Sequence, residues 1–364
     1  MKYLACLGRE ARISIAELEA QGAKILHADQ KIAVFSSDAP FDIDRFGGII
    51  KFAEELGQKP LDYLKSLDAG KITLGVSDFS SHASAKTATL EALKLKKILT
   101  RHNRSVRVIE GKSAVLSTAS SLHNGLSGKN PHKVEFIKVN NDWYRVIGIQ
   151  DIDAYTRRDQ ARPARDARVG MLPPKLAQIL INLCGPLPQG SRILDPFCGT
   201  GVVLQEALLM GYRAYGTDIS DRMVEYSKKN LEWLTVPEQT FQVLQGDAVS
   251  FRWTSPIDAV ACEGYLGRPM STIPPDIKLK TEKQTCKEII LGFLKNLSTQ
   301  IASGTPVVIA APAWLRPDGS YSRLEILDFI TDMGYNVNNK TREGLLYHRE
   351  KQIVARDIII LRKN

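Results

Sequence analysis

The hydrophobic and polar positions of this chain repeat with two different periods, which together predict strands interleaved with helices. In the first 150 residues, short apolar runs predict strands at 2–7, 31–35, 72–76, 106–109, 134–139 and 143–149. Apolar residues at helical spacing predict helices at 13–20, 83–99 and 114–122, with a weaker helical pattern at 43–56. This region therefore has the pattern of an α+β domain.

The rest of the chain alternates in the way that is typical of a parallel sheet covered by helices. Apolar runs predict strands at 191–194, 214–217, 241–244, 257–262 and 306–311, and a closing pair at 335–337 and 353–361. Helical spacing predicts helices at 175–183, 202–210, 286–301 and 324–333. We expect an α/β domain with a Rossmann-like outline, in which an antiparallel pair closes the parallel sheet.

The length of 364 residues fits two domains. We place them at residues 1–150 and 175–364, and between them lies a linker at 151–174 with five arginines among residues 157–168. These arginines could pair with Asp159 and Asp166 or be exposed to phosphate groups, since the guanidinium geometry suits both. The sequence leaves the oligomeric state open.

A glycine turn follows the strand at 191–194 and opens the next helix. Gly199 and Gly201 let the backbone approach a ligand closely and place the first N–H groups of the helix beside a negative group. A dinucleotide-binding turn requires a third glycine three residues later, where this chain has Leu204. This departure disfavours NAD.

Two acids at the ends of the following strands favour S-adenosylmethionine as the ligand. Asp218 ends the strand at 214–217 and could accept hydrogen bonds from both ribose hydroxyls. Asp247, after the strand at 241–244, could accept from the adenine amino group. Because open α/β sheets bind ligands at the carboxyl ends of their strands, we expect the glycine turn and both acids to share one site.

The positive charge of the chain is concentrated in its N-terminal part. The net charge is +9, and residues 1–150 hold 22 Lys and Arg against 16 Asp and Glu. Leu90, Leu93 and Ile98 are expected to pack inward from the helix at 83–99, which leaves a basic face outward. We predict RNA contacts from five residues of this helix and the turn after it: Lys94, Lys96, Lys97, Arg101 and Arg104. A merely solvated face is the alternative.

The sequence gives no indication of a metal site or of a membrane segment. Its five cysteines contain no C-x-x-C pair, and its six histidines have no metal-ligand spacing. Charged residues interrupt every apolar run near the N-terminus, and no apolar stretch is long enough to cross a bilayer. We therefore expect no metal, no membrane partner and a cytoplasmic location.

Taken together, these motifs resemble the THUMP-containing tRNA guanosine N2-methyltransferases, which modify guanosine ten of tRNA, and their bacterial relatives. The resemblance extends over nearly the whole chain and rests on Leu7-Gly8, Ala16-Glu17-Leu18, Ser113-Ala114, Asn124-Gly125-Leu126, Arg158-Asp159, Arg162-Pro163, Gly170 to Ala177, Asp195 to Gly201, Asp218-Ile219-Ser220, Asp247-Ala248 and Ala355-Arg356-Asp357. It implies a Rossmann-like class I methyltransferase domain preceded by a ferredoxin-like portion and a THUMP module that grips tRNA.

The resemblance also implies roles for individual residues. The methionine end of S-adenosylmethionine would be lined by Asp195, Phe197, Gly199, Thr200 and Gly201. Asp218 and Ile219 would hold the ribose and the adenine face, and Asp247 and Ala248 the adenine edge.

One motif departs from the family. The family has Asp-Pro-Pro-Tyr at the end of the fourth strand, whereas this chain has Cys262-Glu263-Gly264-Tyr265. We expect Glu263 to accept from the target amine and Tyr265 to stack on a base that has left its helix. The alternatives are that Glu263 is a structural acid, that the acceptor is another amine of rRNA or DNA, or that the chain binds RNA without turnover. The sequence leaves open the target nucleotide and the number of methyl groups added.

Overall fold

The computed structural model describes residues 1–364 except 40, 167–170, 235–239 and 351, and the chain forms two compact units. The first comprises residues 1–15 and 22–154, and the second comprises 16–21 and 155–364. Arg168 and Gly170, which belong to the predicted linker, lie outside the described residues. The helix α5 (Ile152–Gln160) occupies the first part of that linker.

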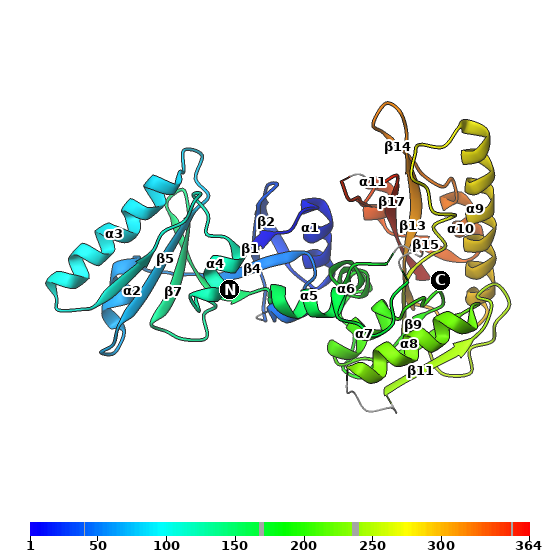
Figure 1. Cartoon of the computed structure of the whole chain (residues 1–364), viewed down its shortest axis with the longest axis horizontal. Helices are drawn as coiled ribbons and strands as arrows, with labels where there is room; N and C mark the ends of the chain where they lie inside the picture. Colours follow the sequence, from blue (N-terminus) through cyan, green and yellow to red (C-terminus); the bar gives the residue numbers. More distant parts are fainter. Residues whose placement is uncertain (40, 167–170, 235–239, 351) are drawn as a thin grey trace. The chain divides into compact units, whose positions relative to one another are not determined.

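The first unit contains one mixed sheet in the order β2-β3-β1-β4-β8-β7-β5-β6. Its strands are β1 (Lys2–Leu7), β2 (Lys24–Ala28), β3 (Ile32–Ser36), β4 (Ile49–Glu55), β5 (Ile72–Asp78), β6 (Val106–Ile109), β7 (Lys133–Val139) and β8 (Asp142–Ile149). Its helices are α1 (Ala11–Ala20), which continues into the second unit, α2 (Pro60–Ser66), α3 (Ala85–Arg101) and α4 (Thr118–His123). In Figure 1, α3 lies along β5 at one face of this sheet.

The helix expected at 43–56 was a wrong prediction. A single 3-10 turn at Ile43–Arg45 is followed by β4, whose neighbours are β1 and β8. Lys51 of β4 made the pattern misleading, because a lysine in a sequence is normally counted as an exposed position. Here its Nζ lies 2.6 Å from Glu135 Oε1, and both side chains are almost fully buried. Lys51 also donates to Leu116 O and Ser121 Oγ, so its charge is fully satisfied inside the core.

The second unit has the Rossmann-like fold that the sequence predicts, with the strand order β11-β10-β9-β12-β13-β17-β15. Its strands are β9 (Arg192–Asp195), β10 (Arg213–Asp218), β11 (Phe241–Gln245), β12 (Ala259–Glu263), β13 (Pro306–Leu315), β14 (Tyr321–Ser322), β15 (Tyr335–Val337), β16 (Leu346–Tyr347) and β17 (Val354–Lys363). The strands from β11 to β13 are parallel, and β17 is antiparallel to β13.

Helices cover both faces of this sheet. They are α6 (Pro174–Leu183), α7 (Val202–Leu209), α8 (Asp221–Trp233), α9 (Asp276–Ser298), α10 (Leu327–Asp332) and α11 (Asn339–Glu343). In Figure 1, α9 lies on one side of β13 and α6 on the other. Ile290 and Phe293 of α9 pack with Val260 and Ile309 of the sheet in the main core. The carboxyl ends of β9, β10, β11 and β12 therefore lie along one edge.

Candidate active site

The glycine turn after β9 has the backbone conformation that its glycines predict. Gly199 and Gly201 have φ angles of +50° and +82°, in the left-handed region that other residues rarely adopt. A Cβ on Gly201 would lie 2.9 Å from Ser227 Oγ and 3.2 Å from Ser227 Cα. Glycine is therefore required at position 201 both for its backbone angle and for the close approach of α8.

Asp218, at the end of β10, fastens this turn. Its Oδ2 accepts a hydrogen bond of 2.9 Å from the Gly199 N–H, and its Oδ1 accepts one of 2.9 Å from the Ser220 N–H. Each carboxylate oxygen can accept a second hydrogen bond. Asp218 can therefore hold the turn in place and still accept from two hydroxyl groups.

The third strand end completes the edge. Gly246 N donates to Asp218 O across 2.9 Å, which joins the end of β11 to the end of β10. Asp247 is exposed, and Ala248 beside it is buried. Ile219 is 69% exposed, so an apolar side chain is available to cover the face of a flat ring.

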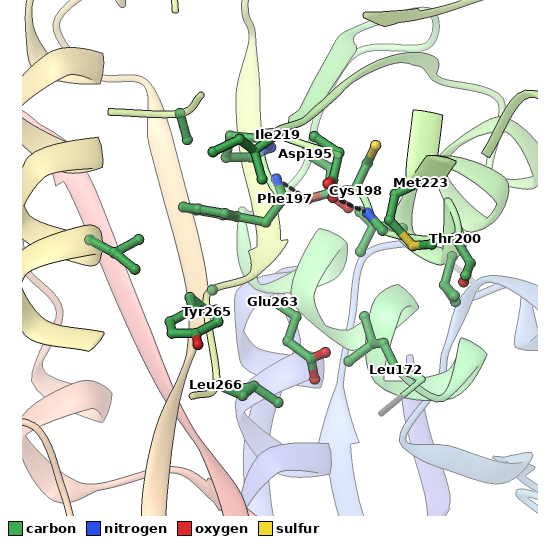
Figure 2. Close-up of a pocket in the computed structure, with 18 of the residues that line it drawn as sticks. Leu172, Asp195, Phe197, Cys198, Thr200, Ile219, Met223, Glu263, Tyr265 and Leu266 are labelled. Carbon is green, nitrogen blue, oxygen red and sulfur yellow. Dashed lines mark hydrogen bonds between the residues drawn. The ribbon is translucent and has the colours of Figure 1, made fainter. Parts of the chain in front are cut away.

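A cavity of about 760 Å³ brings these groups together (Figure 2). Its wall includes the predicted residues Asp195, Phe197, Gly199, Thr200, Asp218, Ile219, Asp247, Ala248, Glu263 and Tyr265. Gly201, which was expected to line the ligand, is not one of the lining residues and is instead the N-cap residue of α7. Sequence reasoning missed the apolar lining residues Leu172, Met223 and Leu266, which carry no chemical signal of their own, although Leu172 lies in the motif of the predicted linker.

The fourth strand end adds an acid and an aromatic ring to this wall. Figure 2 shows the Glu263 carboxylate in the cavity, with Tyr265 and Leu266 nearby. The preceding Cys262 is fully buried in the core beneath the sheet. In this chain, therefore, Glu263 and not Cys262 presents a side chain to the cavity.

Glu263 is held by an arginine from the last strand. Arg356 Nε of β17 lies 2.8 Å from Glu263 Oε1, and their side chains are 4% and 16% exposed. Burial raises the pKa of the Glu263 carboxyl, and the Arg356 and Arg349 guanidinium groups oppose that rise. Burial also raises the pKa of Asp195 well above its usual range.

The described linker arginines pair within the second unit. Arg158 Nε lies 2.7 Å from Glu206 Oε1 on α7, and Arg162 Nη1 donates to Thr200 Oγ1 across 3.3 Å. Asp166, in turn, accepts from Arg222 of α8 at 2.6 Å. Arg158 therefore pairs with an acid, but the acid is Glu206 of α7 and not Asp159 or Asp166 of the linker.

The basic helix α3 turns a different apolar face inward from the one expected. Ala88, Ala92 and Leu99 are buried, whereas Leu90 and Leu93 are 45% and 39% exposed. The expectation that these two leucines pack inward was wrong, because the small alanines allow α3 to approach β5 closely.

The five predicted RNA contacts differ in their surroundings. Lys97 and Arg101 are exposed, Lys96 is half-buried, and Lys94 pairs with Glu91 at 3.0 Å. Arg104 donates to Leu67 O and Asp68 O at 2.9 and 2.7 Å, which anchors the chain after α2. Lys97 and Arg101 are therefore the best placed to meet a polyanion.

The part of the chain that the structure describes contains no candidate metal site and no candidate membrane span. No group of three or more His, Cys, Asp or Glu side chains in these residues has an arrangement that could hold a metal ion. None of the helices formed by these residues combines the length and the apolar character needed to cross a bilayer.

Comparisons with known proteins find methyltransferases. Residues 162–285 match the family model described as "RMKL-like, methyltransferase domain". The chain is 37% identical over 182 residues to the tRNA (guanine(10)-N2)-dimethyltransferase of Methanothermobacter thermautotrophicus. This alignment covers 47% of this chain and 51% of the relative. It is 40% identical over 108 residues to the protein of the same name from Pyrococcus abyssi, and this alignment covers 29% of this chain and 31% of that relative. The alignments thus span about half the length of the curated relatives or less.

Among solved structures, TrmN from Thermus thermophilus matches 100% of both chains with a TM-score of 0.51 and 16% identity. This likeness shows the fold. The resemblance to the tRNA guanosine N2-methyltransferases is confirmed, over about half of the chain, by the similarity to the named relatives.

Proposed function

We propose that this chain is an S-adenosylmethionine-dependent methyltransferase that modifies the exocyclic N2 of a guanosine in tRNA. The observation that carries the proposal is that one cavity is lined by residues of the glycine turn, by Asp218 and Asp247, and by Glu263 and Tyr265. The names of the similar proteins support the same substrate and reaction.

The residues present fit S-adenosylmethionine better than a dinucleotide. The cavity volume of about 760 Å³ lies within the usual range for small-molecule sites. Leu204, which replaces the third glycine of the dinucleotide motif, is fully buried, and a Cβ on Gly216 would lie 2.5 Å from its Cδ1. The close packing of helix on strand therefore depends here on Gly216 of the strand. When bound, S-adenosylmethionine would supply a methyl group activated by a positive sulfur.

The residues of the fourth strand end would prepare the target amine. The lone pair of the guanine amine is delocalised into the ring, so an acceptor for its hydrogens must favour the nucleophilic form. The Glu263 carboxylate, with one oxygen paired to Arg356, is that acceptor. It would take the proton that the amine loses when the new N–C bond forms and the S–C bond breaks. Holding both partners in place contributes effective molarities of about 10⁵ M or more.

Tyr265 would stack on the target base. Replacing Tyr265 with alanine should lower methyl transfer by about tenfold or more, since one stacking contact contributes about 1 to 3 kcal/mol. Replacement with phenylalanine keeps the ring and should leave the rate within about threefold. Single-turnover rates on unmodified tRNA measure both variants. An equal loss in both would assign the effect to the hydroxyl group and remove stacking from the mechanism.

We further propose that residues 1–150 form the ferredoxin-like and THUMP portion that binds RNA, that 151–174 link it to the catalytic domain, and that 175–364 carry the chemistry. Changing Lys97 and Arg101 together to glutamine should reduce the salt slope of RNA binding by about 1.5, at about 0.7 to 0.9 per phosphate contact. Cofactor affinity should not change. The matched control is the change of the exposed Lys24 and Lys31 to glutamine. A slope that stays constant in the α3 variant, or falls equally in the control, would identify α3 as a solvated face.

The function itself is tested by mapping methyl groups. The protein is incubated with methyl-labelled S-adenosylmethionine and RNA from a strain that lacks the modification, and the digested nucleosides are separated. Label in N2-methylguanosine or N2,N2-dimethylguanosine supports the proposal. Label in another nucleoside, or in DNA, would indicate a different amine acceptor, and no transfer to any nucleic acid would indicate a binding protein without turnover.

A further inference from the structure

The ion pair between Glu263 and Arg356 joins two segments that are 93 residues apart. Arg356 Nε donates to Glu263 Oε1 at 2.8 Å, and its Nη1 donates to Gln352 Oε1 at 3.0 Å. The other carboxylate oxygen, Glu263 Oε2, makes no hydrogen bond to the residues that the structure describes. One oxygen of the acid is therefore occupied by the protein, and the other is left for a ligand.

The register of the sheet explains how Arg356 reaches this acid. Glu263 lies opposite Ala310 of β13, and Arg356 lies opposite Pro312, two positions further along the same strand. Side chains two positions apart share a face of a sheet, so all four belong to one face. Ala310 and Pro312 carry small side chains, which leaves room for the long arginine to cross β13 to the end of β12.

We infer that Arg356 is a positioning residue for the reaction, which fixes the Glu263 carboxylate through Oε1 and directs Oε2 toward the target amine. This inference rests on the proposed function. A buried pair of this kind contributes little net stability, because the cost of removing both charges from water offsets their attraction. The pair is therefore explained by its effect on Glu263, since Arg356 keeps this acid of the cavity wall charged and oriented.

The charges around Glu263 give Arg356 a measurable effect. Burial acts to keep the Glu263 carboxyl protonated. The charge of Glu263 in turn helps to raise the pKa of the buried Asp195 of β9, whose own burial is the main cause of its raised pKa. Arg356 of β17 opposes the effect of burial on the pKa of Glu263, with a smaller contribution from Arg349. Removal of Arg356 should therefore raise the pKa of Glu263 further, as expected when an opposite charge at this distance is lost.

Two variants separate charge from orientation. Arg356→Gln removes the charge, so the acid limb of the kcat profile should move to higher pH, with a loss of about tenfold or more on the acid side that is partly recovered at higher pH. Arg356→Lys keeps the charge but not the directed N–H of Nε, so kcat should fall with little movement of the profile. The KM for RNA should stay within about threefold in both. A loss that is equal at every pH in Arg356→Gln would overturn the inference.

A second readout does not depend on turnover. In protein labelled with ¹³C at the glutamate carboxyl groups, the Glu263 signal is identified by its loss in Glu263→Gln, and its pKa is measured in each variant. A raised pKa in Arg356→Gln supports the inference even if no RNA is methylated, which would contradict the proposed function alone. An unchanged pKa would overturn it. Arg158→Gln, which removes the buried pair with Glu206, is the control and should leave the Glu263 titration unchanged.

Discussion

Replacing Glu263 with glutamine should slow methyl transfer by about 10² to 10³, or about 3 to 4 kcal/mol, as for other single electrostatic contacts in a transition state. Glutamine keeps the size of the side chain and one neutral acceptor, but it cannot take a proton from the amine. The affinities for cofactor and RNA should stay within a few fold. Single-turnover rates with saturating cofactor separate this loss of chemistry from a loss of binding.

The role of Glu263 also predicts the direction in which the rate changes with pH. Glutamate acts as an acceptor in its charged form, and burial raises the pKa of Glu263. The wild-type rate should therefore rise with pH through a value above the usual glutamate range, and Glu263→Gln should lose this limb. Glu288→Gln, an exposed acid on α9, is the matched control and should retain it. If Glu263→Gln transferred methyl groups at the rate of the wild type, Glu263 would be a structural acid without a role in the reaction.

Replacing Asp218 with alanine should weaken S-adenosylmethionine binding by at least about 100-fold, since two hydrogen bonds to a charged acceptor contribute about 3 kcal/mol or more. The structure adds a second reason for a large effect. The Asp218 carboxylate also accepts from the N–H groups of Gly199 and Ser220, so its removal releases the glycine turn that cradles the ligand. Calorimetric titration measures the affinity.

Asp221→Ala serves as the control for this change, because Asp221 is an exposed acid three residues further along the chain. It should bind the cofactor like the wild type. Asp218→Asn should fall between the two, since the amide oxygen replaces one acceptor while the amide nitrogen cannot accept from an N–H group. Unchanged affinity in Asp218→Ala, or tighter binding of NAD than of S-adenosylmethionine, would contradict the assignment of this edge.

The part of the site that local sequence could predict is the part built from strand ends. Asp195, Asp218 and Asp247 each follow a short apolar run, and parallel strands bring such positions to one edge. Arg356 could not be assigned to Glu263 in this way, because their contact crosses a third strand and depends on the register of β17. Local pattern also failed where packing overrides it: Leu90 is exposed on α3, whose contact face is made of small residues.

The buried Lys51–Glu135 pair has a consequence for how the N-terminal unit unfolds. Lys51 belongs to β4, which pairs with β1, and Glu135 belongs to β7, which pairs with β5, so one charge pair spans both halves of the sheet. If one half unfolded while the other kept its core, the remaining charge would stay buried without its partner, at a cost of about 3 to 5 kcal/mol. The two halves are therefore tied into one cooperative folding unit, and neither would persist as a stable fragment without the other.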